Sequence, residues 1–323
     1  MKLSVVIAVY NTELYLEKCI QSVLKSPLSE NDYEIIVIND GSTDKSQLIV
    51  ENIMRENANI KLINKKNGGQ STARNVGFQL AKGDYIFCLD SDDYIDGELF
   101  SLALNYACEN DLDMFPIQFI KVSENNEILL FRDTYRELSS IITGAEFMNR
   151  FVISGAMARY FYKTEIIKKN NLKLIEGIYH EDEEFVIRFL TFVKRITYSK
   201  TPVYYYLYRK SSTVNNTNFE HRRKLLNDLL LVIDSLDELA NNKTQDVLTI
   251  NGIEKKKQQL IISVIIKMFK DKYSSIEFNE VLSKLEHKGY YPVVTDKLSF
   301  KHRIVGEIFN VKNLMKVFFN KMF

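Results

Sequence analysis

Short apolar runs alternate with amphipathic segments along residues 1–110. The apolar runs have the length of buried strands, and the segments between them carry hydrophobic residues at the three- and four-residue spacing of one helix face. The pattern predicts strands at residues 3–9, 33–38, 60–63 and 84–89, with helices at 12–25, 43–57 and 70–81. This alternation is typical of an α/β domain in which helices cover both faces of a mostly parallel sheet.

The pattern changes after residue 110 and again near residue 215. Further strands are predicted at 114–122, 128–131, 196–199 and 202–209, and helices at 144–151, 181–192, 222–239 and 255–270. A polar, loop-like stretch at 211–218 separates a mixed region from a helical one. We therefore expect one domain at 1–215, with halves at 1–110 and 111–215, followed by a helical C-terminal region at 216–323.

Charge and composition narrow the classes of partner. The formal net charge is +1, from 43 basic and 42 acidic residues, so nothing in the whole chain favours nucleic acid as a partner. The three cysteines show no CxxC pairing, which indicates free thiols. No signal-peptide profile precedes the first strand, and no apolar stretch approaches the roughly 20 residues that span a bilayer. We expect a cytoplasmic protein, and the oligomeric state is left open.

An acidic cluster, Asp90-Ser91-Asp92-Asp93, follows the apolar run at 85–89. Carboxylates at the end of a buried strand are costly unless a cation or hydrogen-bond donors compensate them. That edge of an open α/β sheet is also where ligands bind. The cluster therefore predicts a divalent cation, Mn²⁺ or Mg²⁺, together with a diphosphate. The structural alternative is a polar cap on the helix that follows, although three carboxylates exceed what capping needs.

Two further loops lie at the same expected edge. Asp40 ends the second strand, where an acidic residue can accept hydrogen bonds from a nucleoside, but Asp-Gly-Ser-Thr-Asp is also good helix-capping chemistry. Asn67-Gly68-Gly69 permits a close backbone approach at a helix start, and Arg74 lies one turn further on. Arg74 can pair with a diphosphate or orient Asp90, and the alternative is a glycine-rich turn with a solvated arginine.

The second half of the chain supplies another acidic group. His180-Glu181-Asp182-Glu183-Glu184 stands at a predicted helix start, where the helix dipole stabilises negative charge. Acidic residues in a first helical turn are also ordinary for helices. A tyrosine-rich segment then ends in Arg209, and its tyrosines are equally compatible with strand packing.

Together these segments resemble glycosyltransferase family 2, the inverting GT-A enzymes that use nucleotide-activated sugars. The resemblance rests on four motifs in the same order: residues 4–11 (SVVIAVYN), 39–44 (NDGSTD), 67–69 with 74–77 (NGG and RNVG), and 89–93 (LDSDD). It covers residues 3–210 and implies a GT-A fold with a Rossmann-like nucleotide-binding half.

The resemblance also implies roles for individual residues. Asp182 is the expected catalytic base, and His180 and Glu181 lie on the acceptor side. Asp92 is the expected metal ligand, with Asp90 and Asp93 as further candidates. The expected nucleotide-sugar contacts are Ala8, Tyr10, Glu13, Asp40, Asn67, Gly68, Arg74, Asp90, Ser91 and Arg209. Ala8 departs from the family, which usually has proline there.

The implied reaction is transfer of a hexose from a UDP-sugar (UDP-Gal or UDP-Glc, with UDP-GlcNAc as a further option) to a sugar hydroxyl, with formation of a β-linkage. The expected acceptor is a lipid-linked precursor on undecaprenyl diphosphate, for an O-antigen, a capsule or an exopolysaccharide. Two alternatives are a sugar nucleotidyltransferase and a non-catalytic, membrane-recruited binding module. The loop after the first strand lacks the glycine-rich basic signature of the former, and the latter needs neither Asp92 nor Asp182.

The chain ends in a basic amphipathic segment at 301–323. Apolar residues alternate there with five lysines and arginines against a single acid, Glu307. Such a helix can lie in an anionic membrane interface, which would place the protein peripherally on the inner face of the cell membrane. The alternative is a terminal helix packed on the preceding helices.

Overall fold

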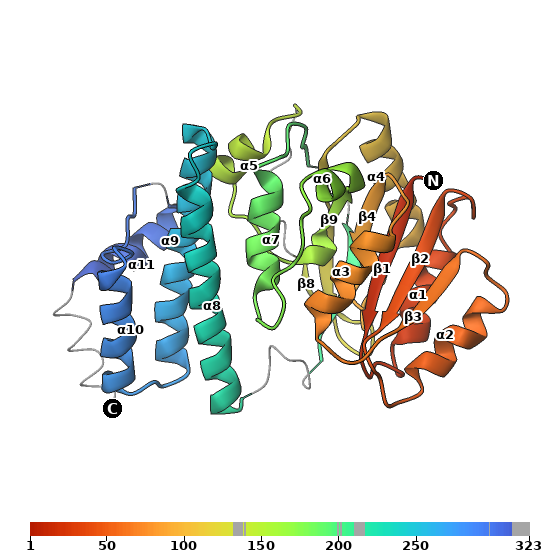
Figure 1. Ribbon diagram of the computed structural model, residues 1–323, viewed down its shortest axis with the longest axis horizontal. Coiled ribbons are helices and arrows are strands. Elements are labelled where there is room, and N and C mark those ends of the chain that lie inside the picture. Colours follow the sequence, from red (N-terminus) through yellow and green to blue (C-terminus); the bar gives the residue numbers. More distant parts are fainter. Residues whose placement is uncertain are drawn as a thin grey trace. The chain divides into compact units, whose positions relative to one another are not determined.

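The computed structural model describes residues 1–131, 138, 140–198, 200, 202–209, 217–296 and 298–311 (Figure 1). Two compact units divide the chain. The first contains residues 1–147 and 154–215, and the second contains residues 148–153 and 216–323.

Six strands form the larger sheet of the first unit, in the order β3-β2-β1-β4-β9-β6. Their bounds are β1 Leu3–Val9, β2 Tyr33–Asn39, β3 Ile60–Asn64, β4 Tyr85–Cys88, β6 Met114–Pro116 and β9 Tyr160–Lys163. The first four are mutually parallel, whereas β9 runs antiparallel to both β4 and β6. The predicted mixed, mostly parallel sheet is thereby confirmed.

Helices cover both faces of this sheet (Figure 1). They are α1 Leu16–Leu24, α2 Ser46–Met54, α3 Gln70–Leu80 and α4 Gly97–Glu109. Alternate residues of β1 point to opposite faces: Val5 and Ile7 join a core with α1 and α4, while Val6 faces α3. A Cβ atom on Gly77 would collide with the Val6 side chain, so the glycine allows α3 to lie directly against the sheet.

A second, four-stranded sheet has the order β5-β10-β7-β8. Its strands are β5 Tyr94–Ile95, β7 Gln118–Val122, β8 Ile128–Phe131 and β10 Pro202–Leu207. β10 is parallel to β7 and antiparallel to β5. Strand β5 directly follows Asp90–Asp93 in the chain, so this acidic loop leads straight into the second sheet.

Three predictions for the middle of the chain were wrong. The run 114–122 is not one strand: it breaks at Ile117, whose N–H donates to the Arg159 carbonyl, and its halves join different sheets. Residues 196–198 form isolated bridges at Ile196 rather than a strand, and residue 199 lies outside the described residues. A helix was expected directly after Asp93, but β5 intervenes and Asp96 caps α4 by accepting from the Leu99 N–H.

The pattern also missed β9 and the short helix α6 (Thr164–Lys169). By contrast, α5 (Gly144–Arg150) and α7 (Glu181–Leu190) were predicted within two residues of their observed ends.

Long helices make up most of the second unit. They are α8 Phe219–Ala240, α9 Val247–Lys270, α10 Ser275–His287 and α11 Phe300–Asn310. The segment 148–153 belongs to this unit because two buried lysines of α9 bind its backbone. The Lys255 ammonium donates to the carbonyls of Met148, Asn149 and Phe151, and Lys256 donates to that of Ile153. Among the helices described, none has the length and apolar character needed to cross a bilayer.

Candidate active site

Asp40 holds the glycine turn that opens α3. Its carboxylate accepts hydrogen bonds from the backbone N–H groups of Gly68 (3.0 Å) and Gly69 (2.7 Å) and from the Lys65 ammonium (2.5 Å). Its carbonyl accepts from the Asn67 side chain at 2.9 Å. The structure thus brings the second and third predicted motifs together. Asp40 does not cap the helix that follows it, and the Gly68 and Gly69 amides at the start of α3 are directed at Asp40.

Hydrogen bonds connect the loop after β1 to the loop after β2. The Asn11 side chain accepts from the Thr43 N–H, the Glu13 N–H donates to Asp44, and the Glu13 carboxylate accepts from the Lys45 N–H. Tyr10 projects from this loop with about half of its surface exposed. The predicted nucleotide contacts Tyr10 and Glu13 therefore lie on one ordered double loop beside Asp40, and Ala8 lies in β1 opposite Ile38 of β2.

The carboxylates of the acidic cluster fall into two kinds. Asp93 is buried, and its two oxygens accept from the Tyr204 hydroxyl (2.5 Å) and the Leu207 N–H (2.7 Å) of β10. Burial and the neighbouring carboxylates Asp90 and Asp92 raise the pKa of Asp93 well above its ordinary value. Asp93 therefore joins the cluster to the second sheet. Ser91 is also buried.

Asp90 and Asp92 are each paired with an arginine instead. The Arg74 guanidinium donates to Asp90 at 2.6 Å, and Arg209 forms an ion pair with Asp92. Both carboxylates remain in part accessible to solvent, with side chains 31% and 21% exposed respectively. Burial and the nearby Asp90 raise the pKa of Asp92, and Arg209 opposes that rise.

The start of α7 presents a second acidic group. His180 precedes the helix in the left-handed region (φ 66°), and its carbonyl accepts from the Glu183 N–H. The Asp182 carboxylate also accepts from the Glu183 N–H, at 2.9 Å. Burial, with the charges of Glu183 and Glu181, raises the pKa of Asp182 to about 8. A carboxylate with this pKa is suited to accept a proton near neutral pH.

Arg74 connects the two acidic groups. Its guanidinium lies 2.6 Å from Asp90 and 3.6 Å from Glu181, and the side chain is buried. Burial opposes the charged form of Arg74, but the facing carboxylates of Asp90 and Glu181 outweigh it and raise the arginine's pKa. The structural alternative of a solvated arginine is wrong, because Arg74 is 5% exposed. Of its two expected roles, the contacts match the orientation of Asp90.

Tyr15 is a site residue that sequence reasoning missed. The Arg209 guanidinium lies over its ring, 4.8 Å from the centroid, and its hydroxyl donates to Glu124 at 3.2 Å. Tyr15 immediately precedes α1 and has no motif of its own, so only the fold reveals its place beside Arg209.

Asp90 and Asp92 can supply part of the ligand set of a divalent cation. Carboxylate oxygens are the ligands that Mg²⁺ and Mn²⁺ favour, and both carboxylates are partly accessible. Within the described ranges, no three His, Cys, Asp or Glu side chains converge into a fuller metal site. A cation held by Asp92 and Asp90 would therefore take its other ligands from a bound diphosphate and water.

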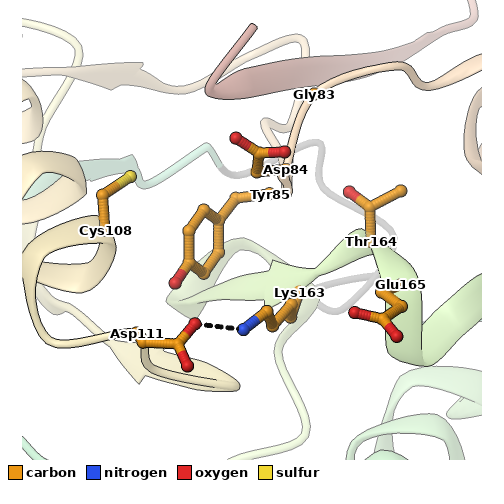
Figure 2. A pocket seen from close by; sticks show the side chains of 8 residues that line it. All are labelled: Gly83, Asp84, Tyr85, Cys108, Asp111, Lys163, Thr164 and Glu165. Atoms are coloured by element: carbon orange, nitrogen blue, oxygen red, sulfur yellow. Dashed lines mark hydrogen bonds and ion pairs between the residues drawn. The ribbon is translucent and has the colours of Figure 1, made fainter.

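A cavity of about 430 Å³ lies at the opposite edge of the sheet (Figure 2). It opens where β4 begins and β9 ends, and its lining includes Asp84, Asp111, Lys163 and Glu165. Lys163 is paired with Asp111. The cavity lacks the glycine loop and the paired arginines of the other edge, so we do not assign the donor to it.

Comparison with known proteins agrees with this geometry. The profile of the family "Glycosyl transferase family 2" matches residues 4–169, just over half of the chain. The glycosyltransferase EpsJ of Bacillus subtilis is 33% identical over 216 residues, which are 63% of this chain and 60% of EpsJ.

Two solved structures share the fold. The crystal structure of S. aureus TarS 1–349 in complex with UDP-GlcNAc has a TM-score of 0.68 at 21% identity, over 98% of this chain and 90% of that one. TarS is a poly(ribitol-phosphate) beta-N-acetylglucosaminyltransferase. The mannosyltransferase PcManGT of Pyrobaculum calidifontis, in complex with GDP-Man and Mn²⁺, has a TM-score of 0.56 at 11% identity, over 97% and 87% of the two chains. The chain therefore belongs to glycosyl transferase family 2 and has the GT-A fold.

Proposed function

We propose that the protein is an inverting hexosyltransferase that uses a UDP-sugar and a divalent cation. The donor binds at the carboxyl edge of the larger sheet, between the double loop of Tyr10, Glu13 and Asp40 and the acidic cluster. A family relative of the same fold binds UDP-GlcNAc, which supports UDP as the nucleotide. UDP-Glc, UDP-Gal and UDP-GlcNAc are the sugars to test first.

Asp92, with Asp90, is the proposed cation site. The bound cation would neutralise charge on the departing diphosphate, which is its usual contribution to such reactions. Arg209 is the proposed diphosphate contact from the protein, since it already lies beside Asp92. We assign Asp93 to positioning rather than to the cation, because both of its oxygens accept hydrogen bonds from β10.

Asp182 is the proposed general base. It would remove the proton of the acceptor hydroxyl while that oxygen attacks the anomeric carbon and the bond to the nucleoside diphosphate breaks, which inverts the anomeric configuration. An α-linked donor then yields a β-linkage. Glu181 and His180 flank the base on the acceptor side, and Arg74 ties Glu181 to the donor-side Asp90.

The proposed acceptor is a sugar hydroxyl of a lipid-linked bacterial polysaccharide precursor for an O-antigen, a capsule or an exopolysaccharide, carried on undecaprenyl diphosphate. Support comes from TarS, a poly(ribitol-phosphate) beta-N-acetylglucosaminyltransferase, whose name gives a polymeric acceptor and a β-linked sugar. In this proposal residues 1–215 form the catalytic domain, and the helical region 216–323 follows it.

We further propose that α11 contacts the membrane peripherally from the cytoplasmic side. Phe300, Ile304 and Ile308 are spaced four residues apart and are 80%, 46% and 47% exposed, whereas Phe309 is buried. The rest of the predicted interfacial helix, from residue 312, lies outside the described residues. Replacing Ile304 and Ile308 by serine should reduce flotation with vesicles that contain anionic phospholipid; unchanged flotation contradicts membrane contact through α11.

The observation that carries the proposal is the link Asp90–Arg74–Glu181, which joins the donor-side carboxylates to the helix of the base. The test is a thermal-shift comparison of UDP, GDP and dTDP sugars with Mn²⁺, since ligands that bind the folded state raise its melting temperature. A UDP-sugar should give the largest rise, and Asp92→Ala should abolish the part that depends on Mn²⁺. A larger rise with a GDP- or dTDP-sugar would contradict the proposed donor.

A further inference from the structure

Asn75 is a buried amide that the proposed chemistry does not use. It lies in α3, next to Arg74, and is 5% exposed. Its Nδ2 donates to the Leu174 carbonyl (3.0 Å), and its Oδ1 accepts from the Leu174 N–H (2.8 Å). Both backbone groups of Leu174 are thus bound by one side chain, as a neighbouring strand would bind them. A second bond from Nδ2 reaches the Glu176 carboxylate at 2.9 Å.

The segment held in this way leads directly into α7. Leu172 and Leu174 are buried, while residues 175–180 are exposed or half-buried and run on to the helix that begins at Glu181. These six residues include Gly177 and His180, both with positive φ. The clamp at Leu174 therefore fixes the chain where the stretch that leads to Asp182 begins.

Consecutive residues of α3 hold both ends of this segment. Asn75 binds it at Leu174, and Arg74 lies 3.6 Å from Glu181, the first residue of α7. The same helix begins at the glycine turn held by Asp40, and Arg74 also binds Asp90. Helix α3 therefore contacts both the donor-side loops and the segment that leads to Asp182.

We propose that Asn75 is a positioning residue for the catalytic base: through its clamp on Leu174 it sets where α7 begins, and so where Asp182 stands relative to the donor. This inference rests on the proposed function, because it takes Asp182 as the base. Asparagine suits the role because its amide offers a donor and an acceptor in one plane, which match the N–H and C=O of one residue. Catalysis is sensitive to such placement, since a displacement of about 1 Å can cost roughly a hundredfold in rate.

The clamp also bears on the acidity of Asp182. The charged groups that face this carboxylate are Arg74 from α3, and Glu181 and Glu183 from α7 itself. If the segment before α7 loosens, Asp182 gains solvent and its pKa falls toward the ordinary value of an aspartate. A change at Asn75 that acts through position should thus alter the pH profile, whereas a general loss of stability lowers activity equally at all pH values.

The test compares Asn75→Ala with Glu176→Gln. The first removes all three hydrogen bonds, whereas the second leaves the clamp on Leu174 in place and retains an acceptor for Nδ2. We expect Asn75→Ala to lower kcat by about tenfold to a hundredfold, to leave the Kd for UDP within about twofold of wild type, and to shift the acid limb of kcat/KM to lower pH. Glu176→Gln should match wild type in all three. Asn75→Gln keeps the donor and the acceptor but displaces them by one methylene, so it should show the same changes as Asn75→Ala to a smaller extent, and it serves as the variant if Asn75→Ala folds poorly.

Hydrogen exchange at the Leu174 amide provides a readout without activity. Exchange should be slow in wild type and faster in Asn75→Ala. If Asn75→Ala speeds exchange but leaves kcat and the pH profile unchanged, the positioning role is overturned. The role is also overturned if Asn75→Ala lowers UDP affinity as much as it lowers kcat. Failure of the proposed function is distinct, because the wild-type protein would then transfer no sugar from any UDP donor.

Discussion

The two acidic groups of this site look alike in sequence but are neutralised very differently. In the loop Asp90–Asp93 every carboxylate has a strong partner: Arg74, Arg209, or the hydroxyl and amide that β10 offers to Asp93. At the start of α7, Asp182 accepts one backbone hydrogen bond and is flanked by Glu181 and Glu183.

This difference separates two chemical tasks. Arg74 and Arg209 offset the negative charge of Asp90 and Asp92, and a bound cation could take the place of these arginines. A half-buried carboxylate among other carboxylates binds a proton more readily, and the pKa of Asp182 is accordingly about 8. The loop is therefore suited to hold charge on the leaving group, and α7 is suited to accept a proton.

The largest expected effect comes from removing the base. Asp182→Asn preserves the shape of the side chain but not its basicity, so transfer should fall by roughly 10²- to 10⁴-fold. The Kd for UDP, measured by calorimetry, should stay near the wild-type value, because the donor side is untouched. Transfer at more than a tenth of the wild-type rate would remove Asp182 as the base.

Asp92→Asn removes a carboxylate from the proposed cation site. Without this anionic ligand the Mn²⁺-dependent rate should fall by roughly 10²- to 10³-fold, the size of loss seen when one electrostatic contact to a developing charge is removed. Excess Mn²⁺ should recover part of the activity if Asp90 still binds the cation. A rate that does not depend on Asp92 at any Mn²⁺ concentration contradicts the assignment.

Arg209→Gln removes the positive charge that is paired with Asp92. Arg209 now neutralises Asp92 and, in our proposal, binds the diphosphate of the donor. Its loss should weaken UDP binding by about tenfold, the value of one charge-assisted hydrogen bond, and should strengthen binding of Mn²⁺ alone. Electron paramagnetic resonance of free Mn²⁺ measures the second effect, and weaker Mn²⁺ binding would show that Arg209 does not compete at Asp92.

Glu183→Gln should have the smallest effect, because it acts only on the pKa of Asp182. Glu183 is a neighbour whose negative charge raises the pKa of Asp182, so its neutralisation should lower that pKa. Because transfer needs ionised Asp182, activity should then extend to lower pH while the maximal rate stays close to wild type. The pH profile of kcat/KM checks this, and an unmoved acid limb would contradict the electrostatic link.

The sequence predicts the parallel core and the motif loops well because each depends on local pattern. Strand β1 and the start of α3 were predicted at their observed residues, and Asp40, Gly68 and Gly69 do meet. Pairing across long sequence separation was harder. The partners of Asp93 lie more than a hundred residues away on β10. Strand β9 lies antiparallel between β4 and β6, and no turn signal in the sequence predicts it.

The roles of the individual carboxylates also needed the structure. The sequence offers Asp90 and Asp93 alike as further metal ligands beside Asp92, and only burial and hydrogen bonding set Asp93 apart. The same holds for Tyr15 and Asn75, whose partners are brought to them by the fold.

The pH dependence of wild-type kcat/KM measures the pKa of the proposed base, Asp182. If Asp182 is the base and its environment raises its pKa, kcat/KM should rise about tenfold per pH unit through the acidic range and level off near pH 8. A profile that is already level at pH 5, as an aspartate of ordinary pKa would give, contradicts the account.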